Sequence, residues 1–275
     1  MSASNKPDWG SSYRLIAADK WKAKSAAMGR DVTQAIVDYA QARPGMKILD
    51  LASGTGEPAI SLASRVEPGG EITALDLSAE LLEIAADRAR ERKLTNLAIK
   101  RADAHELPFA DNTFDLITSR FGVMFFEKKA LQEAVRVLKP GARACFLAWG
   151  PFEQPFWLSM MGVVHKHVGG PRTAPGQDPC RYGQSGSLSA ALREAGFGKI
   201  EETTQTVPWT WPGPAEEVWE QAQAMSTPFL PMIKRVPPEK WDQVNREVVE
   251  TVGRYADGGA IKFGARIVLA SGIKS

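Results

Sequence analysis

The chain has 275 residues, of which 44% are hydrophobic and 24% are charged, and its formal net charge is +2. These values are ordinary for a globular protein and argue against a disordered chain. A nearly neutral charge without a run of Lys or Arg argues against a nucleic-acid-binding surface. The sequence shows no secretory signal segment and no uninterrupted apolar run of about 18 residues. We therefore expect a cytoplasmic protein without a membrane span.

Predicted strands alternate with predicted helices along the first 150 residues. This pattern favours a parallel, doubly wound α/β sheet with right-handed crossovers. Ser78 is the expected N-cap of the helix at 79–93. Helical patterns cover 12–42, 59–65, 79–93 and 128–138, and strand patterns cover 47–51, 71–77, 97–101, 114–119 and 143–149.

The amino-acid composition changes after residue 150, where Pro, Gly and aromatic residues become frequent. Helices are expected at 157–168, 188–195, 215–225 and 239–255, and strands at 199–211 and 260–271. About 45 residues separate the last two strands, and an insertion of that length predicts a lid or a substrate pocket. The expected parts are an N-terminal helical cap (1–43), a ligand-binding core (44–150), an insertion over the active site (151–186), a core helix and strand (187–211), a helical lid (212–258) and a final core strand (259–275).

The loop between the first strand and its helix contains Gly54-Thr55-Gly56-Glu57-Pro58-Ala59. This segment satisfies the dinucleotide pattern G-x-G-x-x-G/A. Glycines let the backbone approach a ligand closely, and the N-terminus of the following helix attracts an anion. Both features suit the pyrophosphate of NAD and the carboxylate of a methionine moiety equally well. The loop alone therefore leaves both ligands open.

Three acidic residues near strand ends favour the second ligand. Asp50, four residues before Gly54, would repel a pyrophosphate but attract an ammonium or sulfonium group. Asp76 ends the second strand, where an acid binds ribose hydroxyls. Asp103 follows the third strand and is suited to accept a hydrogen bond from an adenine amino group, with the Ala104 N–H beside it. Three carboxylates around one crevice predict S-adenosylmethionine as the ligand.

Five segments carry a larger pattern: "ILDLASGTGEPA" (48–59), "ITALDLS" (72–78), "RADAHELPFADNTFDLITSRFGVMFF" (101–126), "EAVRVLKPGARACFLAWG" (133–150) and "SLSAALREAGFGKIE" (187–201). In this order and spacing they resemble the class I S-adenosylmethionine-dependent methyltransferases. The resemblance is to the ubiquinone/menaquinone C-methyltransferase-like branch (methyltransferase type 11). It implies a Rossmann-like, doubly wound seven-stranded sheet whose last strand is antiparallel, with helical cap and lid insertions.

The resemblance also implies where the cosubstrate S-adenosyl-L-methionine binds. The methionine end would lie at Asp50 and the glycine loop, and the ribose at Asp76. The adenine would lie between Asp103 and Ala104, and the residues after the fourth strand would be near the crevice. The full set of predicted cofactor-binding residues is Asp50, Ala52, Gly54, Gly56, Asp76, Leu77, Asp103, Ala104, Arg120 and Phe121.

No residue stands out as a catalytic base, so the catalytic residue is left unknown. His165, His167 and Tyr182 are the candidates that the sequence offers. The two histidines are two residues apart on an expected helix and point to different faces. Because no third ligand has suitable spacing, we predict no metal site.

The predicted function is in-line methyl transfer from S-adenosylmethionine to a small-molecule acceptor, giving S-adenosylhomocysteine. Aromatic residues in the outer segments, such as Trp157, Trp209 and Trp219, suit an aromatic or apolar acceptor. The alternatives are an NAD(P)-dependent oxidoreductase and a non-catalytic S-adenosylmethionine-binding module. A macromolecular methyltransferase is disfavoured, because "SRFG" (119–122) stands where such enzymes carry an N-P-P-Y-type motif. We expect no nucleic-acid partner and a monomer or homodimer.

Overall fold

The structure is a computed structural model that describes residues 19–275, so the part of the predicted N-terminal helical segment before residue 19 lies outside it. The chain forms two compact units, each assembled from three segments. The sheet unit comprises 30–151, 179–207 and 266–275. Of the described residues, the helical unit comprises 19–29, 152–178 and 208–265. No helix within residues 19–275 is long and apolar enough to cross a membrane.

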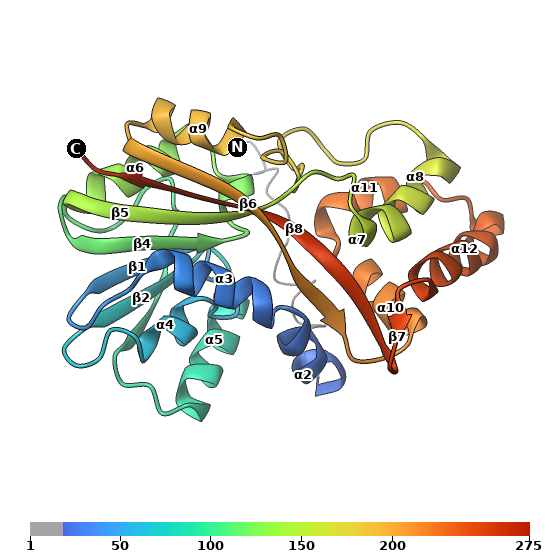
Figure 1. The fold of residues 1–275 in the computed structure, drawn as a ribbon, viewed down its shortest axis with the longest axis horizontal. Helices are drawn as coiled ribbons and strands as arrows, with labels where there is room; N and C mark the ends of the chain where they lie inside the picture. Colours follow the sequence, from blue (N-terminus) through green and yellow to red (C-terminus); the bar gives the residue numbers. More distant parts are fainter. Residues whose placement is uncertain (1–18) are drawn as a thin grey trace. The chain divides into compact units, whose positions relative to one another are not determined.

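The sheet has the strand order β3-β2-β1-β4-β5-β8-β6, with the two-residue β7 paired to β8 (Figure 1). Neighbours from β3 to β5 are parallel, and β5 pairs with β8 in antiparallel fashion. The predicted fold class is therefore confirmed, with β7 as a short addition. The strands are β1 Lys47–Leu51, β2 Glu71–Asp76, β3 Leu97–Arg101, β4 Phe114–Arg120, β5 Leu138–Trp149, β6 Gly198–Trp211, β7 Ala256–Asp257 and β8 Ala260–Ile273.

Two directions of winding place helices on both faces of the sheet. The chain moves outward from β1 through β2 to β3, and then returns to β4 and β5 on the other side of β1. Right-handed crossovers consequently put α4 and α5 on one face and α6 on the other, as Figure 1 shows. Ser78 caps α5 as predicted, since its hydroxyl accepts the Leu81 N–H at 3.3 Å. The helices of this unit are α3 Arg30–Ala40, α4 Ala59–Ala63, α5 Ala79–Glu91, α6 Lys128–Val137 and α9 Ser187–Ala195, with the 3₁₀ turn η1 Val123–Phe125.

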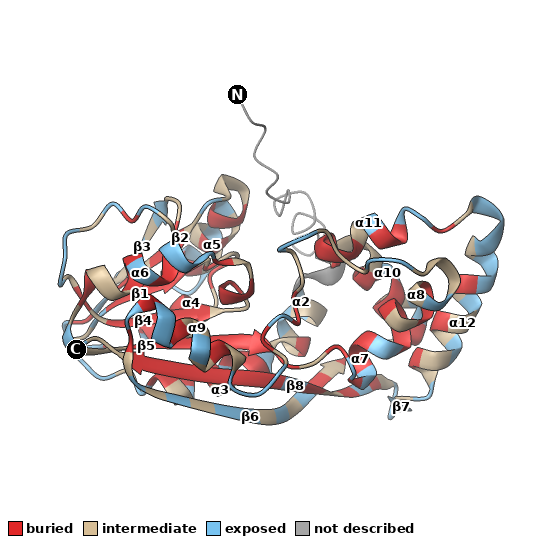
Figure 2. Ribbon diagram, turned by 90° about the horizontal axis from the view of Figure 1, so that it is seen from above, coloured by how far each residue is buried: buried red, intermediate tan, exposed pale blue. Residues whose placement is uncertain are grey.

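The core of the sheet unit is formed by the central strands, which carry near-continuous apolar runs. Such runs are expected for strands covered by helices on both faces. Ile48, Leu49 and Leu51 of β1 are fully buried. In contrast, β6 alternates between half-buried and exposed residues over most of its length, as expected for an edge strand (Figure 2). The central strands therefore form a rigid frame for the loops at their ends.

The helical unit is built around aromatic side chains. The Phe156 ring lies 4.8 Å from that of Trp157, 5.7 Å from Trp209 and 5.6 Å from Phe263, measured between ring centroids. The single helix expected at 157–168 is divided by a π-helical turn, which the apolar spacing did not indicate. The helices and turns of the helical unit are α2 Asp19–Met28, α7 Pro155–Trp157, the π turn η2 Leu158–Gly162, α8 Val163–Val168, α10 Ala215–Met225, η3 Thr227–Phe229, α11 Leu230–Ile233, η4 Pro238–Lys240 and α12 Trp241–Gly253.

The predicted helical stretch 12–42 contains the helices α2 and α3, which belong to different units. α2 falls in the helical unit, whereas α3 belongs to the sheet unit, where it packs against β4 and β5. Val32, Ile36 and Val37 form the buried side of α3. The lid role of 212–258 stays a prediction.

Candidate functional site

The carboxyl ends of β1, β2, β3 and β4 meet at one edge of the sheet unit. In open α/β sheets, ligands bind at this edge, at the point where the strand order reverses. That point lies between β1 and β4. The predicted residues of all four strand ends are thus brought to the same edge.

The glycine loop after β1 adopts backbone conformations that favour glycine. Gly54 has a φ of +55° and Gly56 a φ of +102°, and Ala52 also has a positive φ of +53°. A Cβ added to Gly56 would lie 2.5 Å from the Ile60 Cδ1, so this position has no room for a side chain. A Cβ added to Gly54 would meet no atom of the described residues within 4 Å. Gly54 therefore borders open space in which a ligand can approach the backbone.

Asp76 connects the second strand to this loop. Its Oδ2 accepts the Gly54 N–H at 2.9 Å, and its Oδ1 accepts the Ser78 N–H at 2.9 Å. Burial raises the pKa of the carboxyl group, and these backbone hydrogen bonds act in the opposite direction. Leu77, the next residue, is 46% exposed. Asp76 and Leu77 together therefore present one polar and one apolar group at the strand end.

Asp50 lies inside the sheet, with no exposed surface. It pairs in register with Thr118 of β4, whose hydroxyl donates to the Asp50 Oδ1 at 2.8 Å. Among residues 23–275, the Asp50 Oδ2 has no close hydrogen-bond partner, and neither does the buried Ser119 hydroxyl. Burial raises the pKa of Asp50 to about 7, while hydrogen bonds from the Ser53 and Thr118 side chains and the positive charge of Arg120 lower it. Asp50 is thus a buried carboxyl group at the strand end that leads into the glycine loop.

An ion pair holds the glycine loop against α5. Arg88 donates to the Thr55 carbonyl at 2.6 Å and to the Glu57 Oε1 at 2.9 Å. The other Glu57 oxygen accepts the N–H and the hydroxyl of Ser61. The sequence analysis missed Arg88, although a signal was present. It stands three residues after Ala85, on the buried face of an amphipathic helix, where an arginine is unusual.

Asp103 and Ala104 lie in the loop after β3, as predicted. The Asp103 Oδ1 accepts the backbone N–H of His105 at 3.0 Å and its ring Nδ1–H at 2.6 Å. The His105 Nε2 in turn accepts the Glu127 N–H, just before α6, at 3.2 Å. Ala104 is buried. His105 thus links the predicted adenine side of the site to the start of α6.

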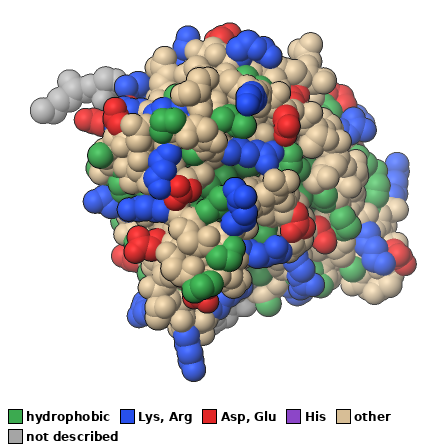
Figure 3. Space-filling view, turned by 60° about the vertical axis from the view of Figure 1, so that its left-hand side comes forward, with side chains coloured by type: hydrophobic (Ala, Val, Ile, Leu, Met, Phe, Trp, Pro, Cys, Tyr) green, Lys and Arg blue, Asp and Glu red, His purple; other side chains and the backbone are tan. Residues whose placement is uncertain are grey.

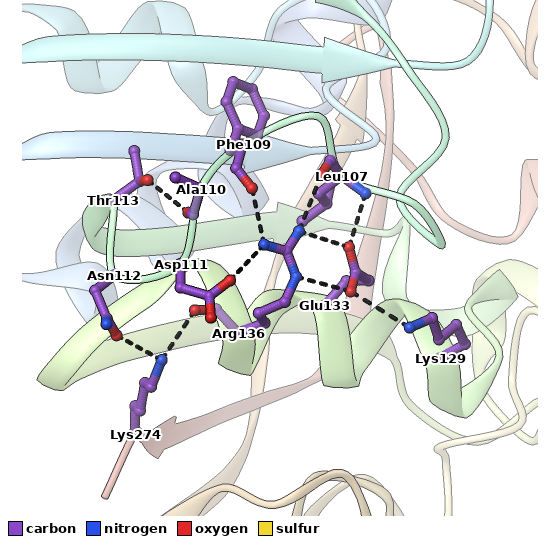
Figure 4. Close-up of polar contacts among 10 residues, drawn as sticks. All are labelled: Leu107, Phe109, Ala110, Asp111, Asn112, Thr113, Lys129, Glu133, Arg136 and Lys274. Carbon is purple, nitrogen blue, oxygen red and sulfur yellow. Dashed lines mark hydrogen bonds and ion pairs between the residues drawn. The ribbon is translucent and has the colours of Figure 1, made fainter.

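A second set of contacts fixes the remainder of this loop (Figure 4). The Arg136 guanidinium of α6 donates to the carbonyls of Leu107 at 2.9 Å and Phe109 at 2.8 Å, and to the Asp111 carboxylate at 2.8 Å. Glu133 accepts from Arg136 and from the Leu107 N–H, the latter at 2.9 Å. The Arg136 hydrogen bond is the main reason why the pKa of Glu133 falls to about 2. The loop is therefore held to α6 by an ion pair.

Arg120 and Phe121 follow the fourth strand. The Arg120 side chain is half-buried, and its Nε donates to the Glu57 carbonyl at 3.4 Å. Phe121 has a positive φ of +63°. Its ring stacks on Trp149 at the end of β5, with the centroids 4.6 Å apart and the planes 11° apart. An arginine and an aromatic pair thus stand at the ends of β4 and β5.

The loops after β1 and β4 touch at Gly122. A Cβ added to Gly122 would lie 2.5 Å from the Ala52 Cβ and 2.7 Å from the Ser119 Oγ. Only a hydrogen atom fits between these two loops.

The three catalytic candidates lie in two different units. In the helical unit, His165 donates to the Gly170 carbonyl at 3.0 Å, and His167 donates to the Glu247 carboxylate at 2.9 Å. In the sheet unit, Tyr182 is buried, and burial raises the pKa of its hydroxyl. The loop that carries Tyr182 packs on the end of β5, because Gly183 leaves no room for a Cβ beside Pro151. The assignment of a catalytic residue stays open among these three.

Comparison with known proteins gives the family. The profile of the ubiE/COQ5 methyltransferase family matches residues 25–161. The ubiquinone/menaquinone biosynthesis C-methyltransferase UbiE of Laribacter hongkongensis is 33% identical over 171 residues, which cover 58% of this chain and 70% of that protein. The chain belongs to the ubiE/COQ5 methyltransferase family.

Two further relatives define the extent of the similarity. UbiE of Idiomarina loihiensis is 42% identical over 114 residues, which cover 40% of this chain but only 45% of that protein. The matched region thus spans roughly half to two thirds of the length of these curated relatives. The crystal structure of the YcgJ protein from Bacillus subtilis has the same fold, with a TM-score of 0.58 and 21% identity over 88% of this chain and 97% of that one.

Family membership confirms the predicted enzyme class and its methyl donor, S-adenosylmethionine, at the level of the family. It also removes the NAD(P)-dependent oxidoreductase from the alternatives. The individual binding residues stay predictions that rest on the geometry described above.

Proposed function

We propose that the chain transfers the methyl group of S-adenosylmethionine to a small aromatic or apolar acceptor and has no nucleic-acid partner. The observation that carries the proposal is the open space at Gly54, whose N–H is held by Asp76, on a loop that Arg120 also contacts through the Glu57 carbonyl. On the face drawn in Figure 3, basic and acidic side chains are interspersed, which suits a small ligand better than a polyanion.

The residues at this edge match the chemical groups of the methyl donor. Asp76 is placed to accept from ribose hydroxyls, since its two oxygens each hold one backbone N–H and have a further lone pair. Exposed Leu77 offers an apolar surface for the adenine, and Asp103 offers a carboxylate near its amino group. Buried Asp50 and half-buried Arg120 offer opposite charges at the methionine end.

The reaction needs little acid–base chemistry from the protein. The sulfonium of the bound donor supplies an activated methyl group. The acceptor atom forms a bond to the methyl carbon as the carbon–sulfur bond breaks, S-adenosylhomocysteine leaves, and the proton of a neutral acceptor passes to solvent. The chain's own residues provide position and exclusion of water. The Phe121–Trp149 stack supports a flat acceptor, because aromatic rings prefer offset stacked or edge contacts.

A screen with radiolabelled methyl donor tests the activity. We expect label to be transferred to one of four classes of acceptor, namely quinols, phenols, amines or thiols. Absence of S-adenosylhomocysteine binding in calorimetry would exclude a methyltransferase. Binding without transfer to any acceptor would instead favour the non-catalytic binding module.

A pair of glycine variants tests the position of the site. Gly54→Ala places a methyl group in the open space and should weaken S-adenosylhomocysteine binding at least tenfold. Gly69→Ala is the matched control, because Gly69 also has a positive φ of +81° and nothing within 4 Å of an added Cβ. Each variant should lose about 1–2 kcal/mol of stability. Equal affinities in the two variants would show that the ligand does not bind at Gly54.

A further inference from the structure

Arg120 differs from the other partly buried arginines of the sheet unit in its lack of an acidic partner. Arg88 pairs with Glu57 at 2.9 Å, Arg136 with Glu133 at 2.8 Å and Arg143 with Glu201 at 3.4 Å. The Arg120 side chain makes one long hydrogen bond, to the Glu57 carbonyl, and contacts the Phe121 ring. No carboxylate oxygen of residues 23–275 forms an ion pair with its guanidinium group. A half-buried cation in this situation is stabilised by an anionic ligand.

The charges around Arg120 are also unbalanced. Glu57 is the acidic residue on the glycine loop, and its carboxylate already faces Arg88 and, at 3.7 Å, Arg92. Arg88 lies close enough to Arg120 for the two positive charges to repel each other. Arg88 and Arg92 therefore already share the Glu57 carboxylate, whose side chain is 11% exposed, and Arg120 contacts only the Glu57 carbonyl. An added carboxylate would relieve this excess of positive charge.

Asp50 supplies an opposite charge that acts on Arg120. Asp50 is fully buried, and its Oδ2 has no close hydrogen-bond partner within residues 23–275. The buried Ser119 hydroxyl also has no partner within these residues. Buried polar atoms without partners indicate a missing water or ligand group. A cation and an anion at neighbouring strand ends match the two charges of an α-amino acid.

We propose that Arg120 binds the α-carboxylate of the methionine moiety and makes the site selective for ligands that carry it. The proposal rests on the proposed function, because it assigns one residue to one group of the methyl donor. A bidentate guanidinium–carboxylate pair suits this role, since it fixes orientation as well as charge.

Calorimetry with two probes separates the carboxylate from the rest of the ligand. S-adenosylhomocysteine carries the amino-acid moiety, whereas 5′-methylthioadenosine keeps the adenosine and the sulfur but lacks it. Arg120→Gln should weaken S-adenosylhomocysteine binding about 10- to 100-fold and change 5′-methylthioadenosine binding less than about twofold. Arg120→Lys keeps the positive charge but loses the two parallel N–H donors of the guanidinium. Its affinity for S-adenosylhomocysteine should lie between those of Arg120→Gln and the wild type.

Arg90→Gln is the matched control, because Arg90 lies on α5 with its side chain 77% exposed. It removes the same charge and should leave both affinities unchanged. Circular dichroism of each variant establishes that the fold is retained. An equal loss for both probes in Arg120→Gln, or no loss for either, would overturn the role of Arg120 and leave the proposed function standing. Failure of the wild type to bind S-adenosylhomocysteine would overturn both.

Discussion

Asp50 illustrates how a single residue acquires unusual chemistry from its place in the sheet. Its position at the end of β1 was predicted from the apolar run that precedes it. The contact between its carboxyl group and Thr118 was not predicted. This contact depends on the register between two strands, and the two residues are 68 positions apart in the sequence. The same limit applies to Arg120, whose lack of an acidic partner is a property of the folded surroundings. The sequence therefore predicted which residues reach the edge, but not how their charges are paired.

The raised pKa of Asp50 predicts a dependence of stability on pH. Between the ordinary carboxyl pKa of about 4 and the native value of about 7, the folded protein binds a proton that the unfolded chain does not. The contribution of Asp50 to the free energy of unfolding should therefore fall as pH rises through this window. Asp50→Asn removes the effect, so its stability relative to the wild type should improve by about 2–3 kcal/mol from pH 5 to pH 8.

Urea unfolding of both proteins at the two pH values measures this change. Asp38→Asn serves as the control, because the Asp38 side chain is 60% exposed and should show no such shift. If Asp50→Asn and the wild type keep the same stability difference at pH 5 and pH 8, the buried carboxyl group titrates normally.

At the scale of elements, hydrogen bonds and ion pairs hold the loop before β4 against α6. The sequence predicted α6 from its helical pattern and placed Asp103 and Ala104 in the loop. It did not indicate that Arg136 reaches three residues of that loop, since Glu133 and Arg136 resemble an ordinary exposed pair three residues apart. The burial of Glu133, with 8% of its side chain exposed, is what makes the pair structural.

Arg136→Met should therefore be strongly destabilising. It leaves the buried Glu133 carboxylate without its main partner and frees the carbonyls of Leu107 and Phe109, at a cost of about 3 kcal/mol or more. S-adenosylhomocysteine affinity should fall as well, because the loop carries Asp103. Thermal unfolding and calorimetry measure the two effects.

Lys129→Met is the control within the same network. The Lys129 side chain is 61% exposed and lies 3.4 Å from Glu133, so its loss should cost less than about 1 kcal/mol. A similar loss of stability in both variants would show that Arg136 contributes only as a surface charge.

At the scale of the whole molecule, β6 and β8 are each divided between the two units. One part of each strand belongs to the sheet unit and the other part to the helical unit. The alternation of strands and helices was sufficient to predict the sheet and its winding. The division of the two N-terminal helices between the units was not predicted, because both have helical spacing and only packing distinguishes them.

The shared strands predict that the two units unfold together. Trp149 is the single tryptophan in the three segments of the sheet unit, whereas Trp157, Trp209 and Trp219 lie in the helical unit. Tryptophan fluorescence thus reports mainly on the helical unit, although the proposed ligand site lies in the sheet unit. At 100 times its Kd, S-adenosylhomocysteine should stabilise both by about 2.7 kcal/mol.

Denaturant unfolding followed by fluorescence and by far-ultraviolet circular dichroism tests this coupling. The two midpoints should coincide and should move together when the ligand is added. Gly54→Ala at the same ligand concentration provides the control, because a tenfold weaker affinity reduces the stabilisation to about 1.4 kcal/mol or less. A fluorescence midpoint that stays in place while the dichroism midpoint moves would mean that the units unfold independently.

Gly122 sets the spacing between the glycine loop after β1 and the loop that carries Phe121. The Ala52 methyl group and the Ser119 hydroxyl already occupy the space around it, so the two loops are as close as a residue without a side chain allows. A side chain as small as a methyl group at this point would act as a wedge and spread β1 from β4. The proposed binding sites of the methyl donor and the acceptor would then move apart. Methyl transfer would thus depend on Gly122, although this residue has no side chain that could contact either ligand.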